Sequence, residues 1–226
     1  MENKLNNKEY FQKKLNSEMN RIEQFETTLK NIDHSNSKGI RIGKIHLSNL
    51  YLNCVKLLCS LNNSPREILP VYLTFLENYK DICTPNDSMY DIIDVFSLGV
   101  LIFDNNEKII DYLEQIFYEY DSTDGMIVFL MNYLKNRDSK ITRSRIKYFN
   151  ELFQSGDKAN KLKIELKLWY SKHSDAYWYN SHKSSNNTYC GYWCFEIAAL
   201  AKILDIDDTT FKVNQYYPYD LVHYKE

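Results

Sequence analysis

Apolar residues recur at intervals of three and four along nearly the whole chain, whereas strict alternation over the length of a strand is hard to find. An α-helix turns once every 3.6 residues, so this spacing is typical of helices that bury one face. The pattern predicts an all-α protein, a multi-helix antiparallel bundle of about eight to ten helices with no sheet of consequence.

Breaks in the apolar pattern set the limits of the expected helices. Ser64 is a good N-cap and Pro65 suits the first position of a helix, while Pro70 is expected to kink or restart that helix. We expect an N-terminal helical region over residues 1–125 and a C-terminal one over 126–226, packed as one compact unit. The expected helices cover residues 7–31, 44–61, 64 onward, 87–103, 106–120, 126–136, 143–153 and 158–174, with a last one that begins at Gly191.

Composition is that of a soluble globular protein, with 44% hydrophobic and 26% charged residues. The amino-terminal residues do not resemble a signal peptide, and no apolar run is long enough to span a bilayer. We therefore expect a cytoplasmic protein without disulfides, metal or cofactor. Five cysteines lie within apolar helical patterns, where we expect buried reduced thiols: Cys54, Cys59, Cys83, Cys190 and Cys194.

Negative charge is concentrated in one stretch of the chain. The formal net charge of the whole chain is −2, yet residues 77–124 hold twelve acidic and two basic residues, which gives −10 and leaves +8 for the remainder. Within this stretch the acids follow helical spacing, at i, i+4 and i+7 and then at i, i+3, i+7 and i+10. The candidate partner-binding residues are Asp87, Asp91, Asp94, Asp104, Glu107, Asp111, Glu114, Asp121 and Asp124.

Two successive helices are thus predicted to bury one face and to present carboxylates on the other. A solvated face is the ordinary explanation of an acidic helix. However, like charges at i and i+4 cost a few tenths of a kcal/mol each, and few lysines lie between the acids. These rows therefore favour a surface that binds a cationic partner.

The last fifth of the chain carries the most unusual motif. After Gly191 the sequence has the form YW-x-FE-x-AALAK-x-L-x-IDD, and a YYPYDL segment follows at residues 216–221. This order resembles the carboxy-terminal region of the PoNi immunity proteins, which neutralise PoNe-type DNase toxins of interbacterial competition. The resemblance is close over about the last forty residues, and the remainder agrees in length and helical character.

The resemblance implies a helical immunity protein that binds a cognate DNase toxin and has no enzymatic activity of its own. DNases hold phosphates with Lys and Arg, so an acidic surface could occupy such a cleft in place of DNA. We accordingly expect a protein partner, no direct contact with nucleic acid and no membrane, with the chain a monomer or a homodimer. The alternative is a helical scaffold that binds another basic protein.

The motif itself we assign to packing, through Tyr192, Trp193, Glu196, Tyr217, Pro218 and Asp220. Glu196 is the one carboxylate in the apolar run, and we expect an arginine or a tyrosine hydroxyl to pair with it, because buried charges need partners. An enzyme that uses Glu196 and a loop histidine is the remaining alternative, which a shaped polar pocket around Glu196 would support. We expect His173, Asp175 and His182 to lie on the surface, and Asp208 or Thr209 to cap a helix.

Overall fold

The structure, a computed structural model, describes residues 4–102, 106–138 and 140–224. These residues form ten α-helices and two short 3-10 turns, and no strand occurs among them, so the all-α prediction is confirmed. The chain divides into two compact units, residues 1–83 with 180–192 and residues 84–179 with 193–226. The regional boundary that we predict after residue 125 falls inside the second unit and stays a prediction.

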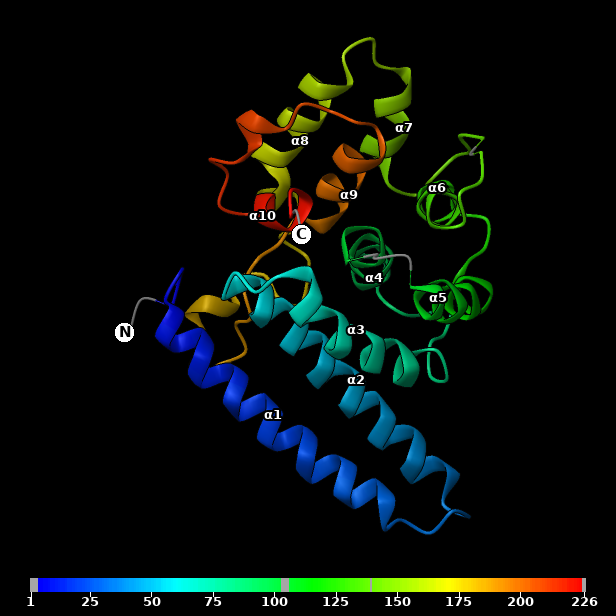
Figure 1. Cartoon of the computed structure of the whole chain (residues 1–226), viewed down its shortest axis with the longest axis vertical. Helices are drawn as coiled ribbons and strands as arrows, with labels where there is room; N and C mark the ends of the chain where they lie inside the picture. The colour runs from blue at the N-terminus through cyan, green and yellow to red at the C-terminus, as the bar shows by residue number, and fades with distance from the viewer. Residues whose placement is uncertain (1–3, 103–105, 139, 225–226) are drawn as a thin grey trace. The chain divides into compact units, whose positions relative to one another are not determined.

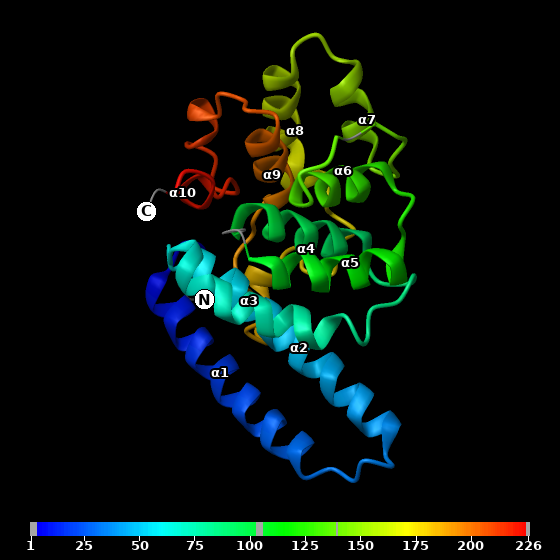
Figure 2. The ribbon, with the colours of Figure 1, turned by 45° about the vertical axis from the view of Figure 1, so that its right-hand side comes forward.

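The first unit is built on three helices, α1 (Lys8–Lys30), α2 (Ser37–Ser60) and α3 (Pro65–Tyr79). In both views α2 lies beside α1 and α3 (Figure 1 and Figure 2). Ser64 caps α3 as predicted, and α3 runs on through Pro70 without restarting. The second helix begins earlier than predicted, because the Asn36 side chain accepts a hydrogen bond from the Gly39 amide and caps it there.

A segment from far along the chain completes this unit. Residues 180–192 include the turn η1 (Ser181–Lys183). They form hydrogen bonds with the start of α1 and with the end of α2. The Tyr10 hydroxyl donates to the carbonyl of Tyr189 at 3.0 Å, and the Ser60 hydroxyl donates to the carbonyl of Cys190 at 3.0 Å. The first part of the carboxy-terminal motif therefore belongs to the core of the first unit.

The second unit is arranged around α4 (Met89–Ile102). In both views α4 lies among α5, α6 and α9 (Figure 1 and Figure 2), and every residue from Ile92 to Ile102 is buried. The other elements of this unit are α5 (Glu107–Tyr120), α6 (Gly125–Leu134), α7 (Lys147–Gln154), α8 (Lys158–Lys172), α9 (Phe195–Ile203), η2 (Thr209–Phe211) and α10 (Tyr219–Val222).

The motif helix α9 begins at Phe195 rather than at the predicted Gly191. Gly191 has a φ of 101°, a conformation that favours glycine and is incompatible with a continuing helix. The amide of Cys194 then donates to the carbonyl of Tyr216 at 2.8 Å, so this part of the motif pairs with the YYPYDL segment. Apolar spacing did not reveal this later start of α9, because a run of consecutive apolar residues does not distinguish a helix from an extended segment.

All five cysteines are buried free thiols. Burial raises the pKa of the Cys54 and Cys190 thiols to about 12. The thiolate is the reactive form of cysteine, and these side chains stay protonated near neutral pH. The cysteines therefore act as small apolar residues of the two cores.

Candidate functional site

The acids of α4 do not form the exposed row that their spacing predicts. Asp87 lies before the helix and accepts a hydrogen bond from the Thr84 hydroxyl at 2.7 Å. Asp91 is half-buried, and Asp94 is only 9% exposed. The predicted exposure is wrong for this helix, because α4 lies at the centre of its unit and buries nearly its whole circumference.

The acids of α5 are more accessible. Glu107 and Asp111 are exposed, and neither forms an ion pair with another residue that the structure describes. Glu114 follows on the same face and pairs with Lys135, the C-cap residue of α6. Tyr118 continues this face one turn further, and it is 67% exposed. Asp104 lies outside the described residues. We call Glu107, Asp111, Glu114 and Tyr118 the α5 face.

The last two predicted acids have structural partners. Asp124 is 4% exposed and caps α6, accepting hydrogen bonds from the amides of Met126 and Ile127. Its carboxylate also accepts from the Ser144 hydroxyl at 2.9 Å and the Arg145 amide at 2.8 Å. Asp121 pairs with the Arg145 guanidinium at 3.1 Å. An arginine from outside the acidic stretch thus neutralises part of it, and Asp124 is unavailable to a partner.

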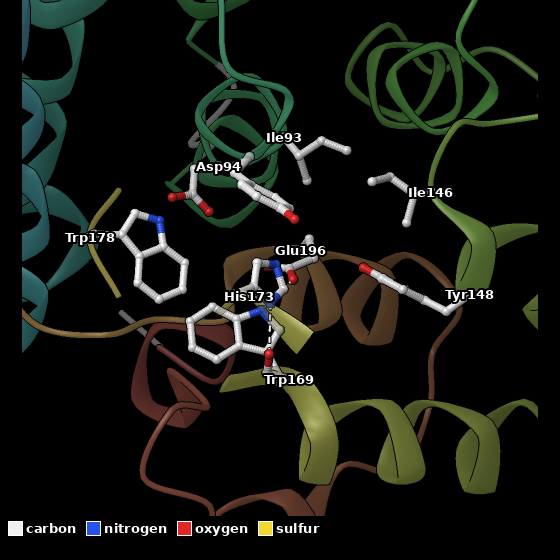
Figure 3. A pocket seen from close by; sticks show the side chains of 9 residues that line it. Ile93, Asp94, Ile146, Tyr148, Trp169, His173, Trp178 and Glu196 are labelled. Atoms are coloured by element: carbon white, nitrogen blue, oxygen red, sulfur yellow. Dashed lines mark hydrogen bonds between the residues drawn. The ribbon is translucent and has the colours of Figure 1, made fainter. Parts of the chain in front are cut away.

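A small pocket lies in the second unit, between α4, α7, α8 and α9 (Figure 3). Its volume is about 30 Å³, two to three times what one water molecule needs. The pocket combines aromatic rings, two carboxylates and two aliphatic side chains. Its lining residues are Tyr90, Ile93, Asp94, Ile146, Tyr148, Trp169, His173, Trp178 and Glu196.

Aromatic rings form one wall of this pocket. The rings of Trp169 and Trp178 stack with their centroids 5.3 Å apart and an interplanar angle of 15°. The His173 ring lies 4.9 Å from Trp169 and 4.6 Å from Tyr90, between centroids. The His173 Nδ1 atom also lies 2.7 Å from the carbonyl oxygen of Trp169, the contact drawn in Figure 3. His173 is thus a half-buried pocket residue, which corrects the predicted surface role.

Glu196 lies deep in the same pocket and is 5% exposed. Its carboxylate accepts a hydrogen bond from the Trp169 indole at 2.5 Å, instead of from the arginine or tyrosine that we expected. Burial, and after it the charge of Glu196, raises the pKa of the Tyr148 phenol and of the Cys194 thiol. The Tyr148 hydroxyl is buried and has no hydrogen-bond partner among the described residues.

The pocket meets only part of what the enzymatic alternative requires. Glu196 and His173 both line it. However, its volume admits two or three water-sized groups, which leaves little room for a substrate. The other loop residues do not line the pocket. Asp175 is exposed at its edge, where it accepts from the hydroxyl of the lining residue Tyr90 at 3.0 Å, and His182 contacts Tyr192 in the first unit.

The remaining motif residues divide into buried and exposed groups. Tyr192, Tyr217 and Pro218 are buried, as packing residues should be. Trp193 is only partly buried and Asp220 is exposed, so these two contribute less to the core than we expected.

A buried carboxylate that we took for a helix cap has another role. The Asp208 side chain caps no helix. It accepts from the Tyr217 hydroxyl at 2.5 Å and contacts the His223 Nε2 atom at 2.6 Å. Asp207 instead accepts from the amide and hydroxyl of Thr209. Asp208 therefore ties the YYPYDL segment to the residues that precede η2.

Sequence reasoning did not single out Tyr148, Trp169 or Trp178, because the first two sit in ordinary amphipathic helices, where spacing predicts packing, and Trp178 sits in a polar segment between helices. Among the described residues, no group of three or more His, Cys, Asp or Glu side chains is placed to hold a metal ion. No helix in the described ranges is both long enough and apolar enough to cross a membrane.

Comparison with known proteins assigns the chain to a family. Residues 2–114 match the family model of the PoNe immunity protein (PoNi), N-terminal, and residues 122–221 match that of the PoNe immunity proteins (PoNi), C-terminal. The crystal structure of protein PA2201 from Pseudomonas aeruginosa is similar in fold, with a TM-score of 0.70 and 14% identity over 95% of this chain and 87% of that one. A comparison with curated proteins finds no significant match. With both halves matched, the chain belongs to the PoNi family of immunity proteins.

Proposed function

We propose that this protein binds a cognate PoNe-type DNase toxin in the cytoplasm and neutralises it by occupying the toxin's basic DNA-binding cleft, without chemistry of its own. The membership of both halves in the PoNi family is the observation that carries this proposal. The described residues add a candidate contact surface, which is the α5 face.

The charge of the α5 face supports this surface. Glu107 and Asp111 are exposed one turn apart, and such like-charged neighbours cost the isolated helix a few tenths of a kcal/mol. A nuclease cleft carries Lys and Arg to hold phosphates, so exposed carboxylates complement it. Opposite charges also speed association, which favours capture of a toxin before it reaches DNA.

Tyr118 gives the same face an apolar component. Its ring is 67% exposed although it lies on a helix whose other face is buried through Ile109, Leu113 and Ile116. Tyrosine is enriched at protein interfaces, because the ring buries apolar area while the hydroxyl forms hydrogen bonds. Charge and an aromatic anchor thus occur together on one accessible helix face.

Charge reversal tests this surface. We expect Glu107→Lys with Asp111→Lys to weaken binding of a cognate PoNe toxin by about tenfold or more, mainly through slower association. The measurement is surface plasmon resonance at two salt concentrations, with survival of cells that co-express the toxin as the functional readout. Salt screens these charges, so the difference in association rate between the variant and the wild type should be smaller at the higher salt concentration.

A matched control has the same change in net charge elsewhere. Glu23→Lys with Asp138→Lys reverses two exposed acids outside the α5 face, and we expect it to leave association nearly unchanged. Equal effects of the two double variants would show a general charge effect and no specific surface. Full protection by the α5 variant would rule out this face as the contact.

A further inference from the structure

We infer that the pocket between α4, α7, α8 and α9 receives the cationic end of a lysine or arginine side chain from a protein partner. This inference rests on the proposed function, since the partner would be the basic toxin. Asp94, Trp169, Tyr148 and Glu196 all line this pocket, and in Figure 3 the Tyr148 hydroxyl points toward Glu196 while the Asp94 carboxylate lies beside Trp178.

The charge of the pocket favours a cation. Asp94 and Glu196 both line it, and its lining, as far as the structure describes it, contains no lysine or arginine. Asp175 adds a third carboxylate at the edge, because it accepts a hydrogen bond from the lining residue Tyr90. Carboxylates that share a small space attract a cation, and the attraction is stronger where bulk water is partly excluded.

The walls suit a cation that has lost part of its hydration. Trp169 and Trp178 stack on each other, and the Tyr90 and His173 rings lie alongside. The face of an aromatic ring attracts ammonium and guanidinium groups within about 6 Å of its centroid, most strongly for tryptophan. The ring faces that are not covered by a neighbouring ring, together with the carboxylates beside them, are therefore complementary to a basic side chain.

The Tyr148 hydroxyl is a separate observation that points to a ligand. It is buried, it points into the pocket in Figure 3, and it has no partner among the described residues. An unsatisfied buried hydroxyl is uncommon in folded proteins and costs stability. Its oxygen can accept a hydrogen bond from an ammonium or guanidinium N–H, which would satisfy it.

The size of the pocket limits what can enter. About 30 Å³ is room for two or three water-sized groups. That is enough for an ammonium group with its last methylene, or for the two terminal nitrogens of a guanidinium group that enters edge-on. Tyr90, His173 and Trp178 are each only partly buried, so the pocket reaches the surface on their side.

A titration with small cations tests the pocket without any toxin. The probes are methylammonium chloride, which represents lysine, and methylguanidinium chloride, which represents arginine, with sodium chloride and neutral acetamide as controls. We expect the indole N–H signals of Trp169 and Trp178 in a ¹⁵N–¹H spectrum to shift and saturate with at least one cation. The probe with the lower dissociation constant identifies the preferred side chain. The third indole, Trp193, does not line the pocket and should stay unchanged.

Two variants separate binding from packing. Tyr148→Phe removes the unpartnered hydroxyl, so we expect stability equal to or above that of the wild type and a cation affinity that falls by about tenfold. Glu196→Gln keeps an acceptor for the Trp169 indole and removes the charge, and we expect a larger loss. Tyr133→Phe, on α6 and outside the pocket, is the matched control and should bind like the wild type.

The outcomes distinguish this inference from the proposed function. Shifts that do not saturate, or that sodium chloride reproduces, would mean that the pocket holds water only and would overturn the inference, while leaving the α5 test valid. If the cation binds but Tyr148→Phe leaves toxin affinity unchanged, the assignment to the partner's side chain is overturned. Weaker cation binding together with weaker toxin binding by this variant would support the inference.

Discussion

Asp208 illustrates how single polar residues organise the second unit. It is 2% exposed and binds both Tyr217 and His223, so it joins the start of η2 to residues near the carboxy-terminal end of the described chain. Burial, and after it the hydrogen bond to Asp208, raises the pKa of the Tyr217 phenol. Asp124 plays a similar part at the start of α6. In both cases a buried carboxylate is stable because several donors surround it.

We expect Asp208→Asn to lower the free energy of unfolding by about 2 kcal/mol, because Tyr217 and His223 contact different carboxylate oxygens and the amide replaces one of these acceptors by an NH2 donor. The measurement is urea unfolding followed by tryptophan fluorescence, since all three tryptophans lie in the second unit with Asp208. Asp207→Asn is the control, because Asp207 is exposed and water can replace its lost contacts. Equal losses for the two variants would contradict a special role for Asp208.

At the scale of elements, the sequence reveals a helix cap more readily than it reveals which faces of a helix are buried. The capping box that starts α3 needs only Ser64, Pro65 and Glu67, which are neighbours in the chain. The environment of α4 depends on α6 and α9, which come later in the sequence. The start of α3 was therefore predicted correctly, whereas the exposure of the α4 acids was not.

The α3 capping box should make stability depend on pH. The Ser64 amide, and after it the Ser64 hydroxyl, lowers the pKa of Glu67 below its usual value of 4.5. A carboxyl with a lowered folded-state pKa contributes stability above the unfolded pKa, and this contribution is lost as the pH falls through the folded value. We expect Glu67→Gln to be less stable than wild type at pH 7 and equally stable well below the folded-state pKa.

Urea unfolding followed by far-ultraviolet circular dichroism, repeated across this pH range, measures the difference. Glu77→Gln is the control, because Glu77 is exposed in the last turn of the same helix and takes no part in the capping box. A Glu67→Gln deficit that stays constant with pH would contradict the linkage.

At the scale of the whole molecule, the first unit consists of two separate stretches of the chain. Residues 180–192 belong to it, although residues 84–179 of the second unit precede them in the sequence. Within the first unit Tyr189 packs against Tyr10 and Phe11. The first unit therefore needs contacts between residues about 180 positions apart. Its stability should depend on this late segment as much as on its own helices.

We expect Tyr189→Ala to destabilise the first unit by about 3 kcal/mol, because the side chain is buried and its removal leaves a cavity. Circular dichroism reports on the helices of both units, whereas tryptophan fluorescence reports on the second. The circular dichroism transition should therefore move further in urea than the fluorescence transition. Tyr177→Ala changes a position that is 73% exposed, so it should shift neither the circular dichroism transition nor the fluorescence transition by much. Identical shifts of both signals for Tyr189→Ala would contradict a separate effect on the first unit.

The candidate site was only partly predictable. Helical spacing correctly identified Glu107 and Asp111 as exposed acids, because α5 lies at the edge of its unit and its apolar face is clear in the sequence. The same spacing failed for Asp94, because α4 is covered on nearly all sides. The pocket was not predictable, because Trp169, Tyr148 and Glu196 come from three helices whose packing no local pattern encodes.

The sequence by itself determined the helical class, most helix starts and the family, because periodicity, capping residues and a long motif are local properties of the chain. Only the tertiary structure decided which acids are available to a partner, where α9 begins and that a polar pocket exists around Glu196. The physical reason is that burial of a side chain depends on what other elements place against it, and those elements lie far away in the sequence.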